Sequence, residues 1–359
     1  MTDLDQRIAS VLRERAEGEI DSHRLLSASR ARGRRRQLRR RFATGTALAL
    51  VGVLGFVGVT GPDLTGLPGR LPWTAATPTV APPVPPRVDG VPGAAQRPEL
   101  VGTDPRVLHL GVDRSRARYL RWAVHSSNRV ESVQFSVGGG RPVLVEVSGS
   151  AEAIDEFLLD GVPLQEAVIP LTFDGAVQEF GGTARGLVTA WQPAPGLYAR
   201  ASTLGGDRSA LAQAMDAVRW DEARRCATPL RLSTLPAGAT LSACSVEATA
   251  FPAGLRVEFT LHREPSATMW VRLLYGAQIA GGTTESNRVV GGRPAYLYPD
   301  GTKLELLGIP KAHLTADFGA PLPGTERPEG DPGFSEADAT GVLAGAQLAK
   351  DLTDPDTWE

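Results

Sequence analysis

The sequence predicts an α+β protein with an N-terminal cytoplasmic helix, one transmembrane helix, a Pro-rich linker and a β-rich extracytoplasmic region of two related β-then-α modules. Three observations lead to this prediction. An uncharged apolar stretch over 42–60 directly follows a run of arginines. Prolines and glycines are frequent over 61–97. From Pro98 onward, short apolar or alternating runs are separated by turn residues, which is typical of strands.

The segment 42–60, FATGTALALVGVLGFVGVT, contains no ionisable residue. At ~1.5 Å per residue, a helix of this length crosses the hydrocarbon core of a bilayer. Because backbone polar groups in lipid must hydrogen-bond within the segment, we expect it to be helical. The alternative is a cleaved or twin-arginine export signal, since Arg39-Arg40-Arg41-Phe42-Ala43 is similar to the core of such a signal. Both interpretations place the rest of the chain outside the cytoplasm.

Arginines are concentrated before the apolar segment, whereas the first charges after it are Asp63 and Arg70. The positive-inside rule therefore predicts residues 1–41 in the cytoplasm and residues 61–359 outside, in a single-pass cell-membrane protein. We expect the same arginines to contact anionic lipid. The residues assigned to this topology signal are Arg34, Arg35, Arg36, Arg39, Arg40 and Arg41.

Residues 1–41 form a basic head in which Leu4, Ile8 and Leu12 recur at helical spacing. One interpretation is a helix that lies in solvent or on lipid beside the membrane. The other is a helix that docks on a cytoplasmic protein partner. Replacing the three residues by Ser distinguishes these interpretations, because only the second depends on the apolar face.

The net charge of the chain is −2, and it divides unevenly. The head, residues 1–41, carries 12 arginines and six acidic residues, so its net charge is +6 and the remainder of the chain carries −8. An acidic body argues against nucleic acid as a partner.

The β-rich region is predicted as module 1 over 98–225 and module 2 over 226–359, each consisting of strands followed by a helix. A Gly-Gly segment beginning at Gly181 recurs 110 residues later at Gly291, and an alternative register aligns Ser127 with Ser286. Strands are expected over 107–112, 119–124, 130–137, 143–147, 167–173, 185–191, 197–202, 229–232, 240–246, 255–262, 269–275, 287–298, 302–307 and 313–318. Helices are expected over 151–159, 210–218 and 338–349, the last opened by the capping box that begins at Ser335.

Cys226 and Cys244 are the only cysteines, and both lie on the predicted extracytoplasmic side. An even pair in an oxidising compartment indicates a disulfide. The segment between them has a strand–turn–strand pattern, which brings the two residues close together. The alternative is metal binding, but two sulfurs with no histidine nearby make a poor zinc site. No C-x-x-C motif is present, so the disulfide is expected to be structural.

The sequence contains no recognisable catalytic, metal or phosphate-binding motif. The five histidines lack H-x-x-x-H and H-E-x-x-H spacing, and no G-x-S-x-G motif occurs. The Gly138-Gly-Gly-Arg-Pro142 segment lacks the Lys-Ser/Thr of a phosphate-binding loop and is expected to join two strands. These observations predict a protein that is not an enzyme and holds no cofactor or metal.

The layout of basic head, single helix, Pro-rich stalk and β-rich domain resembles that of single-pass envelope proteins of actinobacteria, and some membrane-bound anti-sigma factors share this order. The most specific similarity is Arg225-Cys-Ala-Thr-Pro-Leu-Arg-Leu followed by Leu235-Pro-Ala-Gly238. The His-x-x-x-Cys-x-x-Cys signature of zinc-binding anti-sigma factors is absent from the head, which contains no cysteine.

Three functions follow from these observations, and the first is preferred. The chain is a non-enzymatic membrane protein whose extracytoplasmic domain binds an envelope protein or a ligand. The second hypothesis is a transmembrane regulator, similar to an anti-sigma factor, whose head binds a cytoplasmic partner. The third is an exported enzyme without a recognisable motif, which requires a convergent polar pocket.

Overall fold

The computed structural model describes residues 81–358, except for residue 139, residues 156–170, 181–185, residue 206, residues 227–228, 277–284 and 320–332. The predictions for the head, the segment 42–60 and the linker up to residue 80 therefore lie outside the described residues, as do the topology arginines. In the described part of the chain, no helix combines the length and the apolar character that crossing a bilayer requires.

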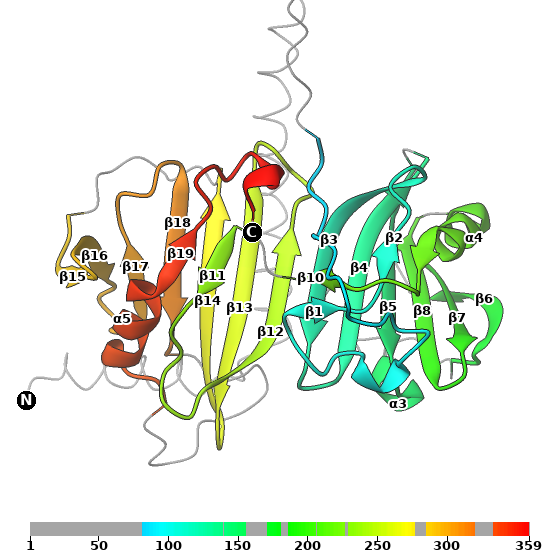
Figure 1. Ribbon diagram of the computed structural model, residues 1–359, viewed down its shortest axis with the longest axis horizontal. Helices are drawn as coiled ribbons and strands as arrows, with labels where there is room; N and C mark the ends of the chain where they lie inside the picture. Colours follow the sequence, from blue (N-terminus) through cyan, green and yellow to red (C-terminus); the bar gives the residue numbers. More distant parts are fainter. Residues whose placement is uncertain are drawn as a thin grey trace, which may run out of the picture. The chain divides into compact units, whose positions relative to one another are not determined.

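The predicted α+β class is wrong, because the described residues are mostly strand. Strands account for 46% of them and helices for 12%. The described residues form one sheet of 13 strands in the order β15-β16-β17-β18-β14-β13-β12-β3-β4-β5-β8-β7-β6, shown in Figure 1. The sheet is continuous because β3 and β12, the first long strands of the two predicted modules, pair with each other antiparallel. Helices are present, but each is ten residues or shorter among the described residues.

The first half of the sheet begins with a three-strand meander and ends with a second meander that returns from the outer edge. Its strands are in the order β3-β4-β5-β8-β7-β6. Their bounds are β3 Ala117–His125, β4 Val130–Val137, β5 Pro142–Ser148, β6 Asp174–Phe180, β7 Gly186–Ala194 and β8 Leu197–Leu204.

The second half repeats this connectivity with one additional strand at its outer edge. Its strands are in the order β12-β13-β14-β18-β17-β16-β15. Their bounds are β12 Thr240–Glu247, β13 Leu255–Arg263, β14 Ala267–Tyr275, β15 Arg288–Val290, β16 Arg293–Leu297, β17 Lys303–Leu306 and β18 Ala312–Asp317.

Each half also has a helix after its last long strand, followed by a short strand that pairs with one preceding the first meander. In the first half α4 (Arg208–Ala217) leads to β9 (Val218–Arg219), which pairs with β2 (Gly111–Val112). In the second half α5 (Glu336–Ala344) leads to β19 (Ala346–Leu348), which pairs with β11 (Leu230–Leu232). The remaining elements are β1 (Val107–Leu108), which pairs with β10 (Arg224–Arg225), the short helix α3 (Ala151–Asp155), and the single 3-10 turns η1 (Pro98–Leu100) and η3 (Pro355–Thr357).

The sequence registers proposed for a repeat do not match the corresponding strands. Residues 186–188 begin β7, the middle strand of its returning meander, whereas Gly291 lies in the turn before β16. Ser127 lies between β3 and β4, but Ser286 precedes β15 at the outer edge. The glycine-rich turns that suggested both registers are a general property of meanders, so they mark turns rather than equivalent positions.

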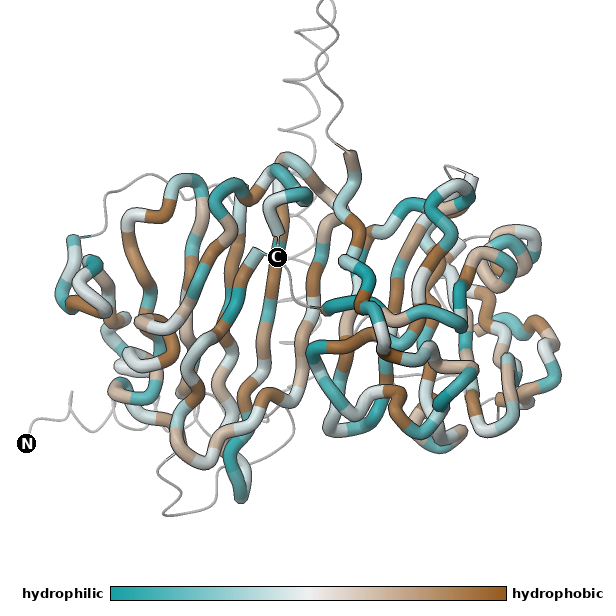
Figure 2. Tube along the Cα trace, in the orientation of Figure 1, coloured by the Kyte–Doolittle hydropathy of each residue, from teal (hydrophilic) through white to brown (hydrophobic). Residues whose placement is uncertain are grey.

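Both helices pack their apolar residues into the same core. Asp207 caps α4 by accepting a hydrogen bond from the Ala210 N–H, and Ser335 with Asp338 forms the predicted capping box of α5. Hydrophobic and hydrophilic residues follow one another along the long strands, as the colouring in Figure 2 shows. The alternate residues face α4, α5 and the short strands, where they form one core cluster that includes Trp122, Phe135 and Phe259.

The end of the predicted linker packs on the body. The Val88 N–H donates to the Ala223 carbonyl over 2.9 Å, and the Ala94 N–H donates to the His109 carbonyl over 2.7 Å. Ala94 is fully buried. Prolines in this segment lack amide donors, so the few remaining N–H groups and the carbonyls attach it to neighbouring strands. The body therefore begins before Pro98.

Candidate functional site

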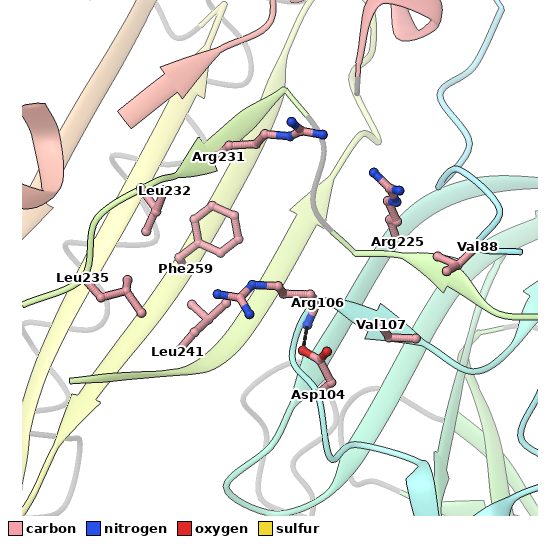
Figure 3. Close-up of a pocket in the computed structure, with 10 residues that line it drawn as sticks. All are labelled: Val88, Asp104, Arg106, Val107, Arg225, Arg231, Leu232, Leu235, Leu241 and Phe259. Atoms are coloured by element: carbon pink, nitrogen blue, oxygen red, sulfur yellow. Dashed lines mark hydrogen bonds between the residues drawn. The ribbon is translucent and has the colours of Figure 1, made fainter. Parts of the chain in front are cut away.

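A pocket of about 370 Å³ lies where the two halves of the sheet meet, on the side of the short strands (Figure 3). We call it the junction pocket. One of its sides comes from segments attached to the first half, and the other comes from β11, β12 and β13. Its lining residues are Val88, Asp104, Arg106, Val107, Arg225, Arg231, Leu232, Leu235, Leu241 and Phe259.

Arg106 is held in a turn that precedes β1. The Arg106 N–H donates to Asp104 Oδ1 over 2.9 Å, and the Val107 N–H donates to the Asp104 carbonyl over 3.0 Å. The Arg106 carbonyl accepts from the Cys226 N–H over 2.9 Å. With its backbone fixed at both ends of the residue, Arg106 extends its side chain toward Leu241 and Phe259 in Figure 3.

Arg225 lies opposite Val107 in the β1–β10 pair. Its N–H donates to the Pro86 carbonyl over 2.7 Å, so the segment that enters the body also fixes this position. Arg231 approaches from β11, where it lies opposite Gln347 of β19. The turn before β1 and the short strands β10 and β11 thus bring three guanidinium groups to one pocket.

The apolar wall of the pocket belongs mainly to the second half. Leu232 and Leu235 lie on and after β11, Leu241 lies on β12, and Phe259 lies on β13. Phe259 is 3% exposed, so it joins the pocket to the core. A ligand in the junction pocket therefore contacts a continuous apolar surface beneath the charged groups.

The predicted disulfide between Cys226 and Cys244 is confirmed. The two Cα atoms are 6.3 Å apart, and both side chains are fully buried. Cys226 directly follows Arg225, and Cys244 lies opposite Phe259 in the β12–β13 pair. The covalent bond therefore connects the charged side of the junction pocket to its apolar wall.

Trp122 supports the same connection from β3. Its indole N–H donates to the Cys226 carbonyl over 3.0 Å, and its side chain is fully buried. A buried indole N–H needs a partner, so this hydrogen bond fixes the position of the chain after Arg225. The first half of the sheet, the disulfide and the second half meet at this point.

The lining of the junction pocket contains more arginines than carboxylates. It has three arginines and one carboxylate, that of Asp104, and one Asp104 oxygen already accepts the Arg106 N–H. Among the described residues, no carboxylate lies within ion-pair distance of the Arg106 or Arg225 guanidinium. Arginine stays charged in proteins and matches carboxylate or phosphate oxygens with two parallel N–H groups. The arrangement suits an anionic group attached to an apolar body.

Sequence reasoning identified the disulfide but not the arginines around it. Arg225 and Arg231 belong to the segment that carried the resemblance, yet neither was assigned a role in binding. Arg106 lies more than a hundred residues earlier, and only the two-residue pairing of β1 with β10 places it nearby. Strands this short have no periodicity that a sequence could show.

One other buried polar cluster, around Glu131, has an evident structural role. Buried Glu131 accepts the Gly102 N–H over 2.8 Å and contacts His109 Nδ1 over 2.6 Å, which holds the segments on both sides of β1 against β4. No group of three metal-ligating side chains lies together in the part of the chain that the structure describes. In comparisons with known proteins, no family model, curated protein or solved structure matches the chain.

Proposed function

We propose that the chain is a non-enzymatic, membrane-anchored binding protein whose extracytoplasmic body binds a small amphipathic anion in the junction pocket. The ligand has a carboxylate, sulfonate or phosphate group next to an apolar body. The observation that carries this proposal is the set of three arginines above an apolar wall, in a pocket of about 370 Å³.

The size of the pocket supports a small ligand. Sites for small molecules commonly range from ~300 to ~1,000 Å³ and are mostly apolar with a few placed polar groups. The junction pocket lies at the lower end of this range. A compact organic anion or the end of a longer chain therefore suits it better than a folded partner.

The chemistry of the pocket supports an anionic ligand. An anion that hydrogen-bonds Arg106 or Arg225 gains charge-assisted contacts, which contribute ~1.5–3 kcal/mol each. An apolar ligand body that covers Leu232, Leu235 and Phe259 adds ~25 cal/mol per Å² of apolar surface removed from water. Neither contribution alone gives selectivity, but together they favour amphipathic anions over simple salts or neutral oils.

Two features support an extracytoplasmic, membrane-anchored location. The uncharged segment 42–60 behind the arginine run is the proposed anchor, with the basic head in the cytoplasm against anionic lipid. The disulfide beside the junction pocket is of a kind that persists in oxidising compartments. In this proposal the pocket faces the envelope, where it binds a ligand or an acidic, apolar group of an envelope protein.

The proposal is tested with anilinonaphthalene sulfonate, an amphipathic anion whose fluorescence rises in apolar sites. The full chain in phosphatidylcholine nanodiscs is titrated with this probe, with empty nanodiscs as the blank. The variant Arg106→Ala/Arg225→Ala is expected to bind the probe at least ~10-fold more weakly, since two charge-assisted contacts are lost. Phe259→Ala is expected to weaken binding of both the probe and its uncharged anilinonaphthalene analogue.

The matched control is Arg208→Ala/Arg256→Ala, which removes two exposed arginines that do not line the junction pocket. It has the same change in net charge and is expected to bind the probe like the unaltered chain. Equal affinity of the unaltered chain and the Arg106/Arg225 variant would refute the proposed site.

A further inference from the structure

A second hollow, of about 820 Å³, lies beside the point where the described chain enters the body. We call it the entry hollow. Its lining is more polar than that of the junction pocket, and three of its residues are arginines at alternate positions. The lining residues are Pro82, Val84, Arg114, Ser115, Arg116, Ala117, Arg118, Tyr119, Ser136 and Gly138.

Arg114 and Arg116 lie in a fixed turn before β3, and Arg118 is the second residue of β3. Asp113 Oδ1 accepts from the Ser115 N–H over 3.0 Å and from the Ser115 hydroxyl over 2.7 Å, while the Asp113 carbonyl accepts from the Arg116 N–H over 3.0 Å. Asp113 is itself paired with Arg219. The turn is thus tied to both its own residues and β9.

The positive charge of the entry hollow is only partly compensated. Arg116 lies 3.7 Å from Asp216, and both side chains are largely exposed. For Arg114 and Arg118, no ion pair occurs within the described ranges, and both are exposed. Exposed guanidinium groups at alternate positions present a surface to phosphate groups rather than enclose one ligand.

The entering segment is attached firmly next to this hollow. After Pro82 and Val84, the Pro85 carbonyl accepts from Arg224 Nη1 over 3.0 Å and the Pro86 carbonyl accepts from the Arg225 N–H over 2.7 Å. Residues 61–81 connect this point to the proposed anchor at 42–60. At ~3.1 Å per residue for an extended Pro-rich chain, they reach at most about 65 Å. The described chain therefore enters the body at the hollow itself, and the proposed anchor precedes this point in the sequence.

We propose that the entry hollow is a docking surface for the anionic phospholipid headgroups of the membrane that holds the segment 42–60. This inference rests on the anchor in the proposed function but not on the junction pocket. Three arginines provide the attraction, and the tether keeps phosphate groups at a high effective concentration beside them. Docking holds the body against the bilayer and fixes which side of it faces the envelope.

A soluble anionic polymer of the envelope would also be attracted to the arginines. The tether favours the membrane, because a polymer has no link to Pro82, whereas the bilayer is connected to it by 21 residues. The experiment includes a polymer arm so that the two sources of phosphate give different results.

The test measures energy transfer from the tryptophans of the full chain to dansyl-labelled lipid in nanodiscs. Transfer is expected to be higher in nanodiscs that contain phosphatidylglycerol than in phosphatidylcholine nanodiscs, and to fall as salt is raised. The variant Arg114→Ala/Arg116→Ala/Arg118→Ala is expected to lose the difference between the two lipid compositions. The control Arg208→Ala/Arg256→Ala/Arg293→Ala has the same net charge and is expected to keep it.

Three results would overturn the inference. Equal transfer in both lipid compositions would show that the body is not held by anionic lipid. Equal loss in the control variant would show a general charge effect. The third result is that polyphosphate, added at matched ionic strength, reverses the energy transfer and binds stably to the entry hollow. This result would identify a polymer as the partner. Two further measurements separate this inference from the proposed function. Extraction of the chain from membranes by alkaline carbonate would refute the anchor. Binding of anilinonaphthalene sulfonate by the Arg106/Arg225 variant tests only the junction pocket.

Discussion

The two halves of the sheet share one connectivity but differ in how deeply their ion pairs are buried on the far face, the face opposite α4 and α5. In the first half, Glu146 on β5 and Arg200 on β8 form an ion pair with an N–O distance of 2.6 Å, and both side chains are 0% exposed. In the second half, Arg272 on β14 contacts Glu258 over 2.6 Å and Asp317 over 3.6 Å. These three side chains remain between 22% and 28% exposed.

This difference shows that equivalent strands of the two halves carry ion pairs of different burial. A buried ion pair exchanges a large desolvation cost for strong mutual attraction, so removing one partner leaves a costly buried charge. A partly exposed network retains water around each group, so loss of one member costs little. The far face of the first half therefore acts as part of the interior, whereas that of the second half acts as a surface.

The largest effect is expected when the buried pair is broken. Arg200→Met leaves the Glu146 carboxylate buried with one fewer cation, and we expect it to lower the free energy of unfolding by about 3–5 kcal/mol. Arg272→Met is the matched change in the second half, and we expect a loss of at most about 1 kcal/mol. Urea unfolding of the full chain, followed by tryptophan fluorescence, measures both. Similar losses in the two variants would contradict the comparison.

A double substitution sharpens the result. Glu146→Leu/Arg200→Met removes both charges, so we expect it to recover most of the stability lost in Arg200→Met. A double variant as unstable as Arg200→Met would mean that the shape of the Arg200 side chain, rather than its charge, stabilises the first half.

The disulfide is expected to have the next largest effect, because it fixes the boundary between the halves. Cys226 and Cys244 close a loop with a sequence separation of 18. Replacing both by Ser is expected to lower the free energy of unfolding by about 3 kcal/mol in the chain-entropy account. The same measurement on the unaltered chain with and without dithiothreitol provides the control. A variant as stable as the oxidised chain would show that β3–β12 pairing alone holds the halves together.

Much of the strand content could be predicted from local pattern. The segment 130–137 was predicted with the bounds that β4 has, because it is rich in β-branched and aromatic residues, which alternate with polar ones from Val133 to Val137. The break between the strands predicted over 287–298 and 302–307 is a turn in which Gly301 has a φ of +68°, and the Ser335 capping box was predicted from its spacing. In each case the pattern that predicts the structure lies within a few neighbouring residues.

Other features depended on contacts that the sequence does not display. The strand β6 (Asp174–Phe180) was missed because an edge strand alternates weakly and carries acidic residues. The stretch predicted as one strand over 287–298 is a hairpin, since Gly291 and Gly292 both have positive φ, at +56° and +77°. The predicted strand over 167–173 lies largely outside the described residues. The junction pocket required three chain segments to meet, so only the disulfide within it could be predicted.

The smallest effect concerns His125, which lies on β3 opposite Ala243 of β12, at the boundary of the halves. Burial, with a further contribution from Arg121, lowers the pKa of His125 to about 4, from an ordinary value of about 6.5. Because the unfolded chain binds this proton more readily, the contribution of His125 is complete above about pH 6.5 and is lost as the pH falls toward 4. Between pH 7 and pH 5 the unaltered chain is expected to lose about 2 kcal/mol through this group. His125→Gln should lack that part of the pH dependence in urea unfolding, whereas the neighbouring Ser126→Ala should retain it. If His125→Gln instead has the same pH dependence as the unaltered chain, His125 can be protonated in the folded state without loss of stability. This part of the far face would then resemble the exposed second half rather than the buried first half.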